Sequence, residues 1–207
     1  MKIKLVYFDF NFWRIDILRL ALSYANIPYE FQRVQRENWA EEKKKYPCGQ
    51  LPVIFIDEQA FCHTHSLAIF CASKSDLYSD NDNERLIINQ VLDWANEITY
   101  RIAHSIREKN QEKSKKLRRI FIEKDLYQWF GYLENFFSQN SKNLFFTGKF
   151  SIADITAWRL IRWFTSDKLD QKDKGFKVKY PKLNEFYESE IIGEKISKLR
   201  EFNEIMS

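Results

Sequence analysis

The pattern of apolar residues changes near residue 80, and no other feature of this sequence constrains its fold as much. Before that point, short apolar runs such as residues 3–8 alternate with segments whose apolar residues recur at helical spacing. After residue 83, stripes at helical spacing follow one another, as in Ile87, Val91 and Trp94. This change predicts a mixed α/β domain followed by an all-helical domain.

The expected elements of the first part come in the order strand, helix, strand, helix, strand, strand, helix. A helix is expected from Arg14 to Asn26, because Pro28 disfavours helical backbone in the residue before it. Residues 29–34 alternate as a strand does, and residues 52–56 and 60–62 read as the two arms of a hairpin. A β-α-β unit followed by a hairpin predicts a mixed four-stranded sheet with helices packed on it.

A polar segment rich in Ser, Asp and Asn separates the two parts of the chain. We place the first domain at residues 1–76, the linker at 77–83 and the all-helical domain at 84–207. Within the helical domain, Ser151 and Asp154 have the spacing of a capping box, which is a signal for the start of a helix.

Charge and hydropathy exclude several classes of protein. The 33 basic and 29 acidic residues give a formal net charge of +4, and no nucleic-acid-reading module accompanies this mild excess. No apolar stretch approaches the ~18 residues of a membrane span, and Asp9 interrupts the first apolar run too early for a signal peptide. Cys48, Cys62 and Cys71 form no closely spaced pair and suit a reducing compartment. We therefore expect a cytoplasmic protein with neither a nucleic-acid nor a membrane partner.

Five features occur in a fixed order along the chain: Tyr7, the pair Trp39 and Lys43, Gln50 to Val53, Ser66 to Ile69, and Ser151 to Asp154. In this order and spacing they resemble the soluble glutathione transferases, and the sigma class most of all. The resemblance extends over essentially the whole chain. It implies a thioredoxin-like first domain that binds glutathione as co-substrate, a helical second domain, a role in detoxification and a homodimer.

Tyr7 is the residue that the resemblance implies for catalysis. Transfer from glutathione needs a thiolate, yet a free thiol has a pKa of about 8.5 and is mostly protonated at neutral pH. A hydroxyl that donates a hydrogen bond to the sulfur stabilises the thiolate and lowers that pKa. Taken alone, Tyr7 would be interpreted as a core tyrosine at the end of a strand.

The resemblance also implies roles for residues around the third strand and the following helix. It implies a cis peptide between Leu51 and Pro52, which would leave the Leu51 backbone free to pair with the extended glutathione peptide. Ser66 is a good N-cap residue, and a helix N-terminus attracts a carboxylate. The resemblance gives Ser66 and its neighbour His65 the γ-glutamyl carboxylate, whereas Ser66 alone would be interpreted as a plain cap.

The implied glutathione-binding residues are Arg14, Trp39, Lys43, Gln50, Leu51, Pro52, His65, Ser66 and Asp93. Trp39 and Lys43 lie one helical turn apart and would meet the glycine carboxylate, while the Gln50 amide would bridge the peptide. Asp93 would reach the glutathione of a partner subunit. Lys43 and Asp93 are also compatible with ordinary solvated positions.

Two departures from the family pattern stand out. Asn11, Phe12 and Trp13 replace the usual Arg-Gly pair, which places bulky aromatic residues where an electrophile would bind, and predicts an altered substrate preference. His65 replaces the usual Gln. His63 and His65 together hint at a metal site, but the sequence shows no third ligand near them, and no metal is expected.

Three functions compete. The first is conjugation of glutathione to small hydrophobic electrophiles. The second is a glutathione-dependent prostaglandin-type isomerase or peroxidase that uses the same thiolate. The third is a non-enzymatic binding or structural protein with the same fold, because a fold does not determine a function.

Overall fold

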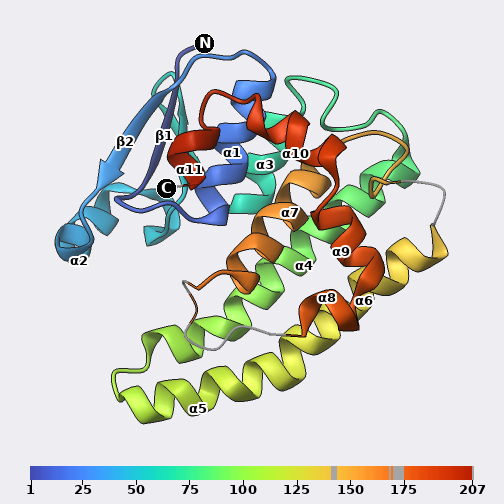
Figure 1. Cartoon of the computed structure of the whole chain (residues 1–207). Helices are drawn as coiled ribbons and strands as arrows, with labels where there is room; N and C mark the ends of the chain where they lie inside the picture. The colour runs from blue at the N-terminus through green and yellow to red at the C-terminus, as the bar shows by residue number, and fades with distance from the viewer. Residues whose placement is uncertain (141–143, 168, 170–174, 207) are drawn as a thin grey trace. The chain divides into compact units, whose positions relative to one another are not determined.

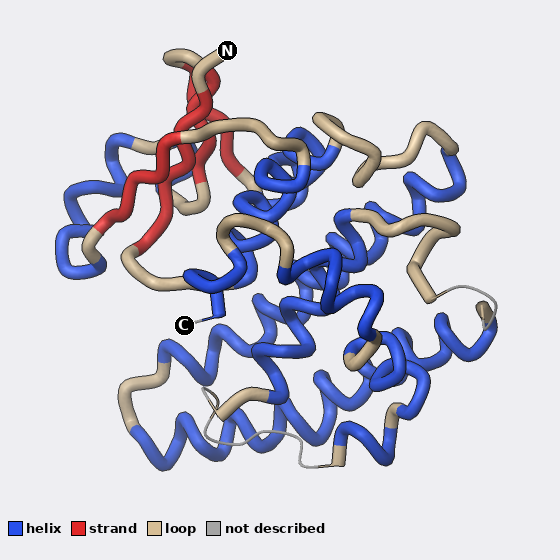
Figure 2. The backbone as a smooth tube through the Cα atoms, turned by 45° about the horizontal axis from the view of Figure 1, so that its top comes forward, coloured by secondary structure: helices blue, strands red, loops and turns tan. Residues whose placement is uncertain are grey.

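The structure is a computed structural model that describes residues 1–140, 144–167, 169 and 175–206. The chain divides into two compact units, one formed by Met1–Asp80 with Lys195–Ser207 and the other by Asn81–Glu194. In the described part of the chain, every strand belongs to the first unit, and the second unit consists of helices (Figures 1 and 2). The predicted fold classes of the two parts are confirmed.

The first unit is built on a four-stranded mixed sheet with the strand order β2-β1-β3-β4. The strands are β1 (Ile3–Phe8), β2 (Glu30–Val34), β3 (Val53–Ile56) and β4 (Gln59–Cys62). β1 pairs in parallel with β2 and antiparallel with β3, and β3 pairs antiparallel with β4. The parallel strands β1 and β2 are joined through a helix, and β3 and β4 are joined through a tight turn, as the sequence predicted.

Two helices, α1 (Trp13–Tyr24) and α3 (Thr64–Ala72), pack against each other in the first unit (Figure 1). Shorter helical turns connect β2 to β3: η1 (Arg36–Asn38), α2 (Trp39–Glu42), η2 (Lys43–Lys45) and η3 (Pro47–Gly49). α1 ends two residues earlier than expected. Asn26 adopts a left-handed φ of 53°, and the Ile27 N–H donates to the Leu22 carbonyl at 2.9 Å. Asn tolerates this conformation, so Asn26 stops the helix before Pro28 is reached.

The last segment of the chain packs with the first unit, although the sequence placed residues 84–207 in one helical domain. Glu204, in α11 (Phe202–Met206), accepts hydrogen bonds from Arg19 at 2.5 Å and from Arg33 at 2.6 Å. The Tyr29 hydroxyl donates to Glu201 at 2.9 Å. Charge pairing between residues so distant in sequence explains the difference, because apolar periodicity carries no information about it.

The second unit contains α4 (Asp82–Arg107), α5 (Gln111–Phe121), the π-helical turn η4 (Ile122–Leu126), α6 (Tyr127–Gln139), α7 (Ile152–Thr165), α8 (Phe176–Lys179), α9 (Pro181–Tyr187) and most of α10 (Glu190–Ser197). α4 packs along α5 and α7. The predicted capping box at the start of α7 is confirmed. Asp154 accepts from the Ser151 N–H at 2.8 Å and from the Phe146 N–H at 3.0 Å.

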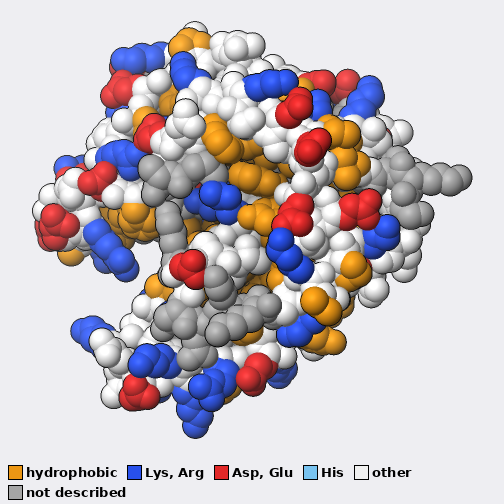
Figure 3. Space-filling model, viewed as in Figure 1, with side chains coloured by type: hydrophobic (Ala, Val, Ile, Leu, Met, Phe, Trp, Pro, Cys, Tyr) orange, Lys and Arg blue, Asp and Glu red, His pale blue; other side chains and the backbone are white. Residues whose placement is uncertain are grey.

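None of the helices in the described ranges is long and apolar enough to cross a membrane. On the face shown in Figure 3, basic and acidic side chains are interspersed. Oppositely charged side chains also form ion pairs, such as Lys44 with Glu41 and Arg101 with Asp125, both at 2.7 Å.

Candidate functional site

Tyr7 lies near the end of β1 and is only 4% exposed. Its ring makes edge contacts with Phe8 and Phe10, with centroids 5.5 and 5.7 Å apart. Burial raises the pKa of the Tyr7 hydroxyl well above its ordinary value, and the nearby Arg14 cation only partly offsets this. The hydroxyl therefore keeps its proton across the physiological range and can act as a hydrogen-bond donor.

Arg14, in the first turn of α1, connects the surroundings of Tyr7 with the start of α3. Its guanidinium donates to the Thr64 hydroxyl at 3.1 Å. Thr64 is the first residue of α3 and is buried. This bond places a cation beside the N-terminus of that helix, where the helix dipole also contributes positive potential.

α3 begins at Thr64, so Ser66 is not its N-cap as the sequence predicted. The N-cap residue is His63, which has a φ of 73° and makes no side-chain capping bond. The first intrahelical bond is donated by the Leu67 N–H to the His63 carbonyl at 3.0 Å. Ser66, which is exposed, and His65, which is half-buried, therefore lie in the first turn. The backbone N–H groups of a first turn have no carbonyl acceptor within their own helix.

Trp39 packs on the same part of the sheet as Leu51. Both side chains are half-buried against a core cluster formed by Val6, Val34, Tyr46 and Val53. The Trp39 ring stacks on Tyr46 with centroids 6.1 Å apart, and it meets the edge of Phe8 at 5.0 Å. These contacts fix the orientation of the indole.

Lys43 lies between Trp39 and Tyr46 in the sequence, Gln50 follows Tyr46, and both residues are exposed. The peptide between Leu51 and Pro52 is cis, which confirms that prediction. Pro52 itself is buried just before β3. Asp93, the last of the expected binding residues, has an exposed side chain on α4 in the second unit.

The aromatic loop before α1 differs from what the sequence predicted. Phe8 and Phe10 stack with centroids 5.6 Å apart, and Phe10 is 40% exposed. Trp13, however, is fully buried, so it belongs to the core and not to a surface that an electrophile would meet. Asn11 donates to the Glu204 carbonyl at 2.6 Å, which ties this loop to α11.

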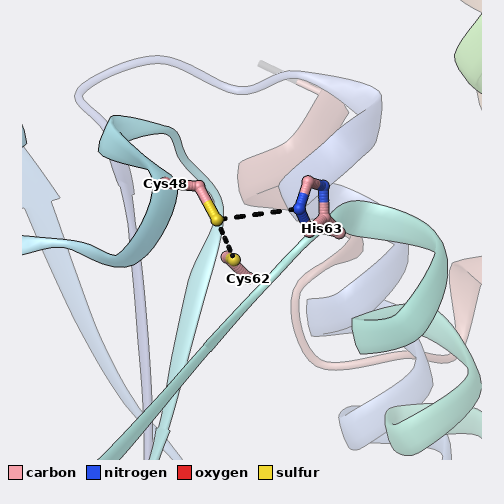
Figure 4. Close-up of side chains that lie close together, drawn as sticks. All are labelled: Cys48, Cys62 and His63. Atoms are coloured by element: carbon pink, nitrogen blue, oxygen red, sulfur yellow. Dashed lines mark hydrogen bonds between the residues drawn. The ribbon is translucent and has the colours of Figure 1, made fainter.

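Sequence analysis missed a cluster beside these residues, formed by Cys48, Cys62 and His63 (Figure 4). The Cys48 and Cys62 sulfur atoms are 3.1 Å apart, and His63 Nε2 is 3.7 Å from the Cys48 sulfur. Burial and the neighbouring Cys48 raise the pKa of Cys62 to about 11. The hairpin register pairs Val53 with Cys62, so the residues that precede β3 had to lie near those that follow β4. That register was the signal by which the cluster could have been found.

The comparisons with known proteins converge on one family. The family model for the glutathione S-transferase C-terminal domain matches residues 96–200. A glutathione S-transferase from Anopheles gambiae is 34% identical over 86 residues, which are 42% of this chain and 42% of that protein. The class-mu 28 kDa isozyme from Schistosoma mansoni is 26% identical over 197 residues, or 90% of this chain and 88% of that protein.

The fold has close counterparts among solved structures. The structure of prostaglandin synthase D of Nilaparvata lugens superposes with a TM-score of 0.81 at 24% identity, over 100% of this chain and 97% of that one. At that level of identity the likeness concerns the fold alone.

Proposed function

Because the chain belongs to the glutathione S-transferase family, which uses glutathione as co-substrate, we propose that it conjugates the glutathione thiolate to small hydrophobic electrophiles. The observation that carries this proposal is the environment of Tyr7: a buried hydroxyl with a raised pKa, electrostatically coupled to Arg14. The same Arg14 donates to Thr64 at the start of α3.

In this mechanism Tyr7 donates its hydroxyl proton in a hydrogen bond to the glutathione sulfur. The bond stabilises the thiolate more than the thiol, so the pKa of the bound thiol falls below its ordinary value of about 8.5. The raised pKa of Tyr7 suits this role, because an ionised tyrosine could not donate. The sulfur then attacks the electrophile, a bond from sulfur to carbon forms, and the leaving group departs with its electron pair.

We further propose that glutathione lies extended beside the end of β3. The Leu51 backbone, at the entry to β3, would pair with the peptide as an added strand. Ser66 and His65, in the first turn of α3, would hold the γ-glutamyl carboxylate by N–H and side-chain donation.

The remaining donors would act on the rest of the peptide. The Trp39 indole and the Lys43 ammonium would meet the glycine carboxylate, and the Gln50 amide would bridge the peptide backbone. Exposed Lys43 and Gln50 side chains support this placement, because both are accessible to a ligand.

The wider biological setting belongs to the same proposal. We infer a sigma-class enzyme acting in detoxification in the cytoplasm, on the basis of the ordered motifs. We also infer a homodimer in which Asp93 of each subunit reaches the glutathione amine bound by the other. Loss of glutathione affinity in Asp93→Ala, together with a dimer mass in solution, would support this arrangement.

The test is a conjugation assay with a general aromatic chloride, comparing the unaltered chain with Tyr7→Phe. We expect turnover to fall about a hundredfold while glutathione still binds, because one preorganised donor to a developing anion has that effect. Tyr46→Phe is the matched control, since Tyr46 packs on the sheet core near Trp39 without a catalytic role. Equal turnover of Tyr7→Phe and the unaltered chain would refute the thiolate mechanism.

One observation favours a second activity. A prostaglandin synthase from Nilaparvata lugens shares this fold, and an isomerisation of a lipid peroxide would use the same thiolate. Turnover of a prostaglandin endoperoxide that exceeds conjugation of every aromatic chloride in a panel would favour this alternative. Failure of the unaltered chain to bind glutathione at all would leave a non-enzymatic role for the fold.

A further inference from the structure

Three side chains with metal-binding atoms converge at one edge of the first unit, and none of the three is a residue assigned to glutathione. Cys48 comes from η3, Cys62 from the end of β4, and His63 from the turn before α3 (Figure 4). One ligand atom from each lies within 4.8 Å of the other two. We propose that these three residues bind a thiophilic cation, with Zn²⁺ as the natural candidate.

The donor atoms decide which kind of ion fits. Thiolate sulfur and imidazole nitrogen favour Zn²⁺ or Cu⁺, whereas Mg²⁺ and Ca²⁺ require oxygen ligands. Two cysteines and one histidine with an open fourth position are a ligand set that catalytic zinc sites use. Cys48 and His63 are exposed, so the fourth position faces solvent and a water molecule or a small thiol can occupy it.

The distances require only a small adjustment. With Zn–S bonds of about 2.3 Å in tetrahedral geometry, the two sulfur atoms would lie about 3.8 Å apart. The Cys48 and Cys62 sulfurs are 3.1 Å apart, so they must separate by less than about 1 Å. His63 Nε2 already lies 3.7 Å from the Cys48 sulfur, which is close to the separation expected of two ligands on one zinc ion.

Two of these residues have a positive φ, which is an unfavourable backbone conformation for a residue other than glycine. Among the described residues other than glycine, four have a positive φ, and Cys48 at 60° and His63 at 73° are two of them. Such conformations are unfavourable for side chains other than glycine and tend to occur at binding or active sites. The pairing of Val53 with Cys62 supplies the frame that brings the two strained positions together.

Direct binding measurements test the proposal without any reliance on transferase activity. The full chain is reduced, freed of metal by a chelator, and titrated with Co²⁺ and then Zn²⁺ in the absence of glutathione. We expect one metal ion per chain, a thiolate-to-cobalt charge-transfer band, and loss of that band when Zn²⁺ displaces Co²⁺.

Variants identify the ligands. Cys48→Ser, Cys62→Ser and His63→Gln should each weaken binding at least about tenfold, since altering even the residues around a metal site has an effect of that size. Cys71→Ala and His104→Gln are the matched controls. Cys71 is fully buried and His104 lies on α4, so both should bind metal as the unaltered chain does.

Three results would overturn the proposal. The first is a reduced chain that binds neither Zn²⁺ nor Co²⁺ although a thiol count in denaturant finds all three of its cysteines free. The second is binding that persists at full affinity in the three ligand variants. The third is a thiol count of one under the reducing conditions used, which would identify a Cys48–Cys62 disulfide in place of a metal site.

Discussion

The first turns of α7 and α3 differ in how the protein caps them. At α7, Ser151 and Asp154 form a complete capping box, and Asp154 is entirely buried. At α3, the N-cap residue His63 makes no side-chain bond to the helix, and Ser66 in the first turn is exposed. The capping box of α7 supplies reciprocal side-chain bonds at its N-cap and third residue, whereas the N-cap of α3 supplies no side-chain bond to its helix.

An open helix start is not sufficient to make a binding site. The α1 N-cap residue, Phe12, makes no side-chain bond either. Arg14 belongs to the first turn of α1, but that turn also carries the acidic Asp16, whereas α3 has no acidic residue in its first turn and its first residue, Thr64, accepts a hydrogen bond from the Arg14 guanidinium. Capping chemistry therefore separates a folding signal from a candidate anion site only when the surrounding charges are considered with it.

The largest effect is expected from removing the capping box of α7. Asp154→Ala removes the acceptor of the Phe146 and Ser151 N–H groups and leaves these buried donors unsatisfied. Each such group costs about 1–3 kcal/mol, so we expect the free energy of unfolding to fall by about 3 kcal/mol. Urea unfolding measures this. Glutathione affinity of the folded fraction should not change, and a change there would contradict the separation of the two regions.

The pH dependence of stability tests the same carboxyl group. Burial raises the pKa of Asp154 to about 7, despite the hydrogen bonds it accepts. In the unfolded chain its pKa is about 3.9, so between about pH 4 and 7 the folded state holds the proton and the unfolded state does not. The Asp154 contribution is therefore complete below about pH 4 and is lost as the pH rises to 7, by at most about 1.4 kcal/mol per pH unit.

Asp154→Asn is the matched variant for this measurement, because its side chain does not titrate. Chemical unfolding at several pH values should show a declining stability difference in favour of the unaltered chain as the pH rises. Parallel stability curves for the two proteins would show that Asp154 is ionised in both states over this range.

Removing a proposed ligand contact in the first turn of α3 should have a smaller effect. Ser66→Ala removes one hydroxyl from the first turn of α3, and we expect glutathione to bind about tenfold more weakly, because a hydrogen bond to a charged group contributes about that much. Stability should stay the same, since Ser66 is exposed and is not the N-cap. Calorimetric titration with Ser73→Ala, another serine associated with α3, as the control would resolve the difference.

The smallest expected effect concerns the N-cap residue itself. His63→Gly relieves a φ of 73°, so we expect a gain in unfolding free energy of about 1 kcal/mol at most. In the same variant the affinity for Zn²⁺ should decrease. A loss of stability in the metal-free variant would mean that His63 contributes packing that outweighs its backbone strain.

Local patterns predicted the elements well, because the apolar periodicity of β1, α1 and the hairpin reflects contacts within short stretches of chain. The capping box was visible for the same reason, since its two partners are three residues apart. The sequence misplaced the start of α3, because nothing in the residue type of His63 signals a positive φ. The sequence placed Trp13 where an electrophile would bind, but Trp13 is buried in the core. An aromatic residue type does not reveal whether its side chain is buried.

The parts that escaped prediction depend on contacts between distant residues. Cys48 meets Cys62 and His63 only through the hairpin register, and Glu204 meets Arg19 across 185 positions. The roles of the candidate glutathione residues came from the ordered motifs and remain predictions to be tested by the variants above.

The return of Lys195–Ser207 to the first unit bears on how this chain folds as it is synthesised. The sheet of residues 1–80 leaves the ribosome early, but Arg19, only 3% exposed, receives the Glu204 carboxylate after the whole second unit has been translated. Until then Arg19 lacks this counter-ion. The nascent chain therefore completes its amino-terminal unit last, and a chaperone has its longest opportunity to act on the residues that emerged first.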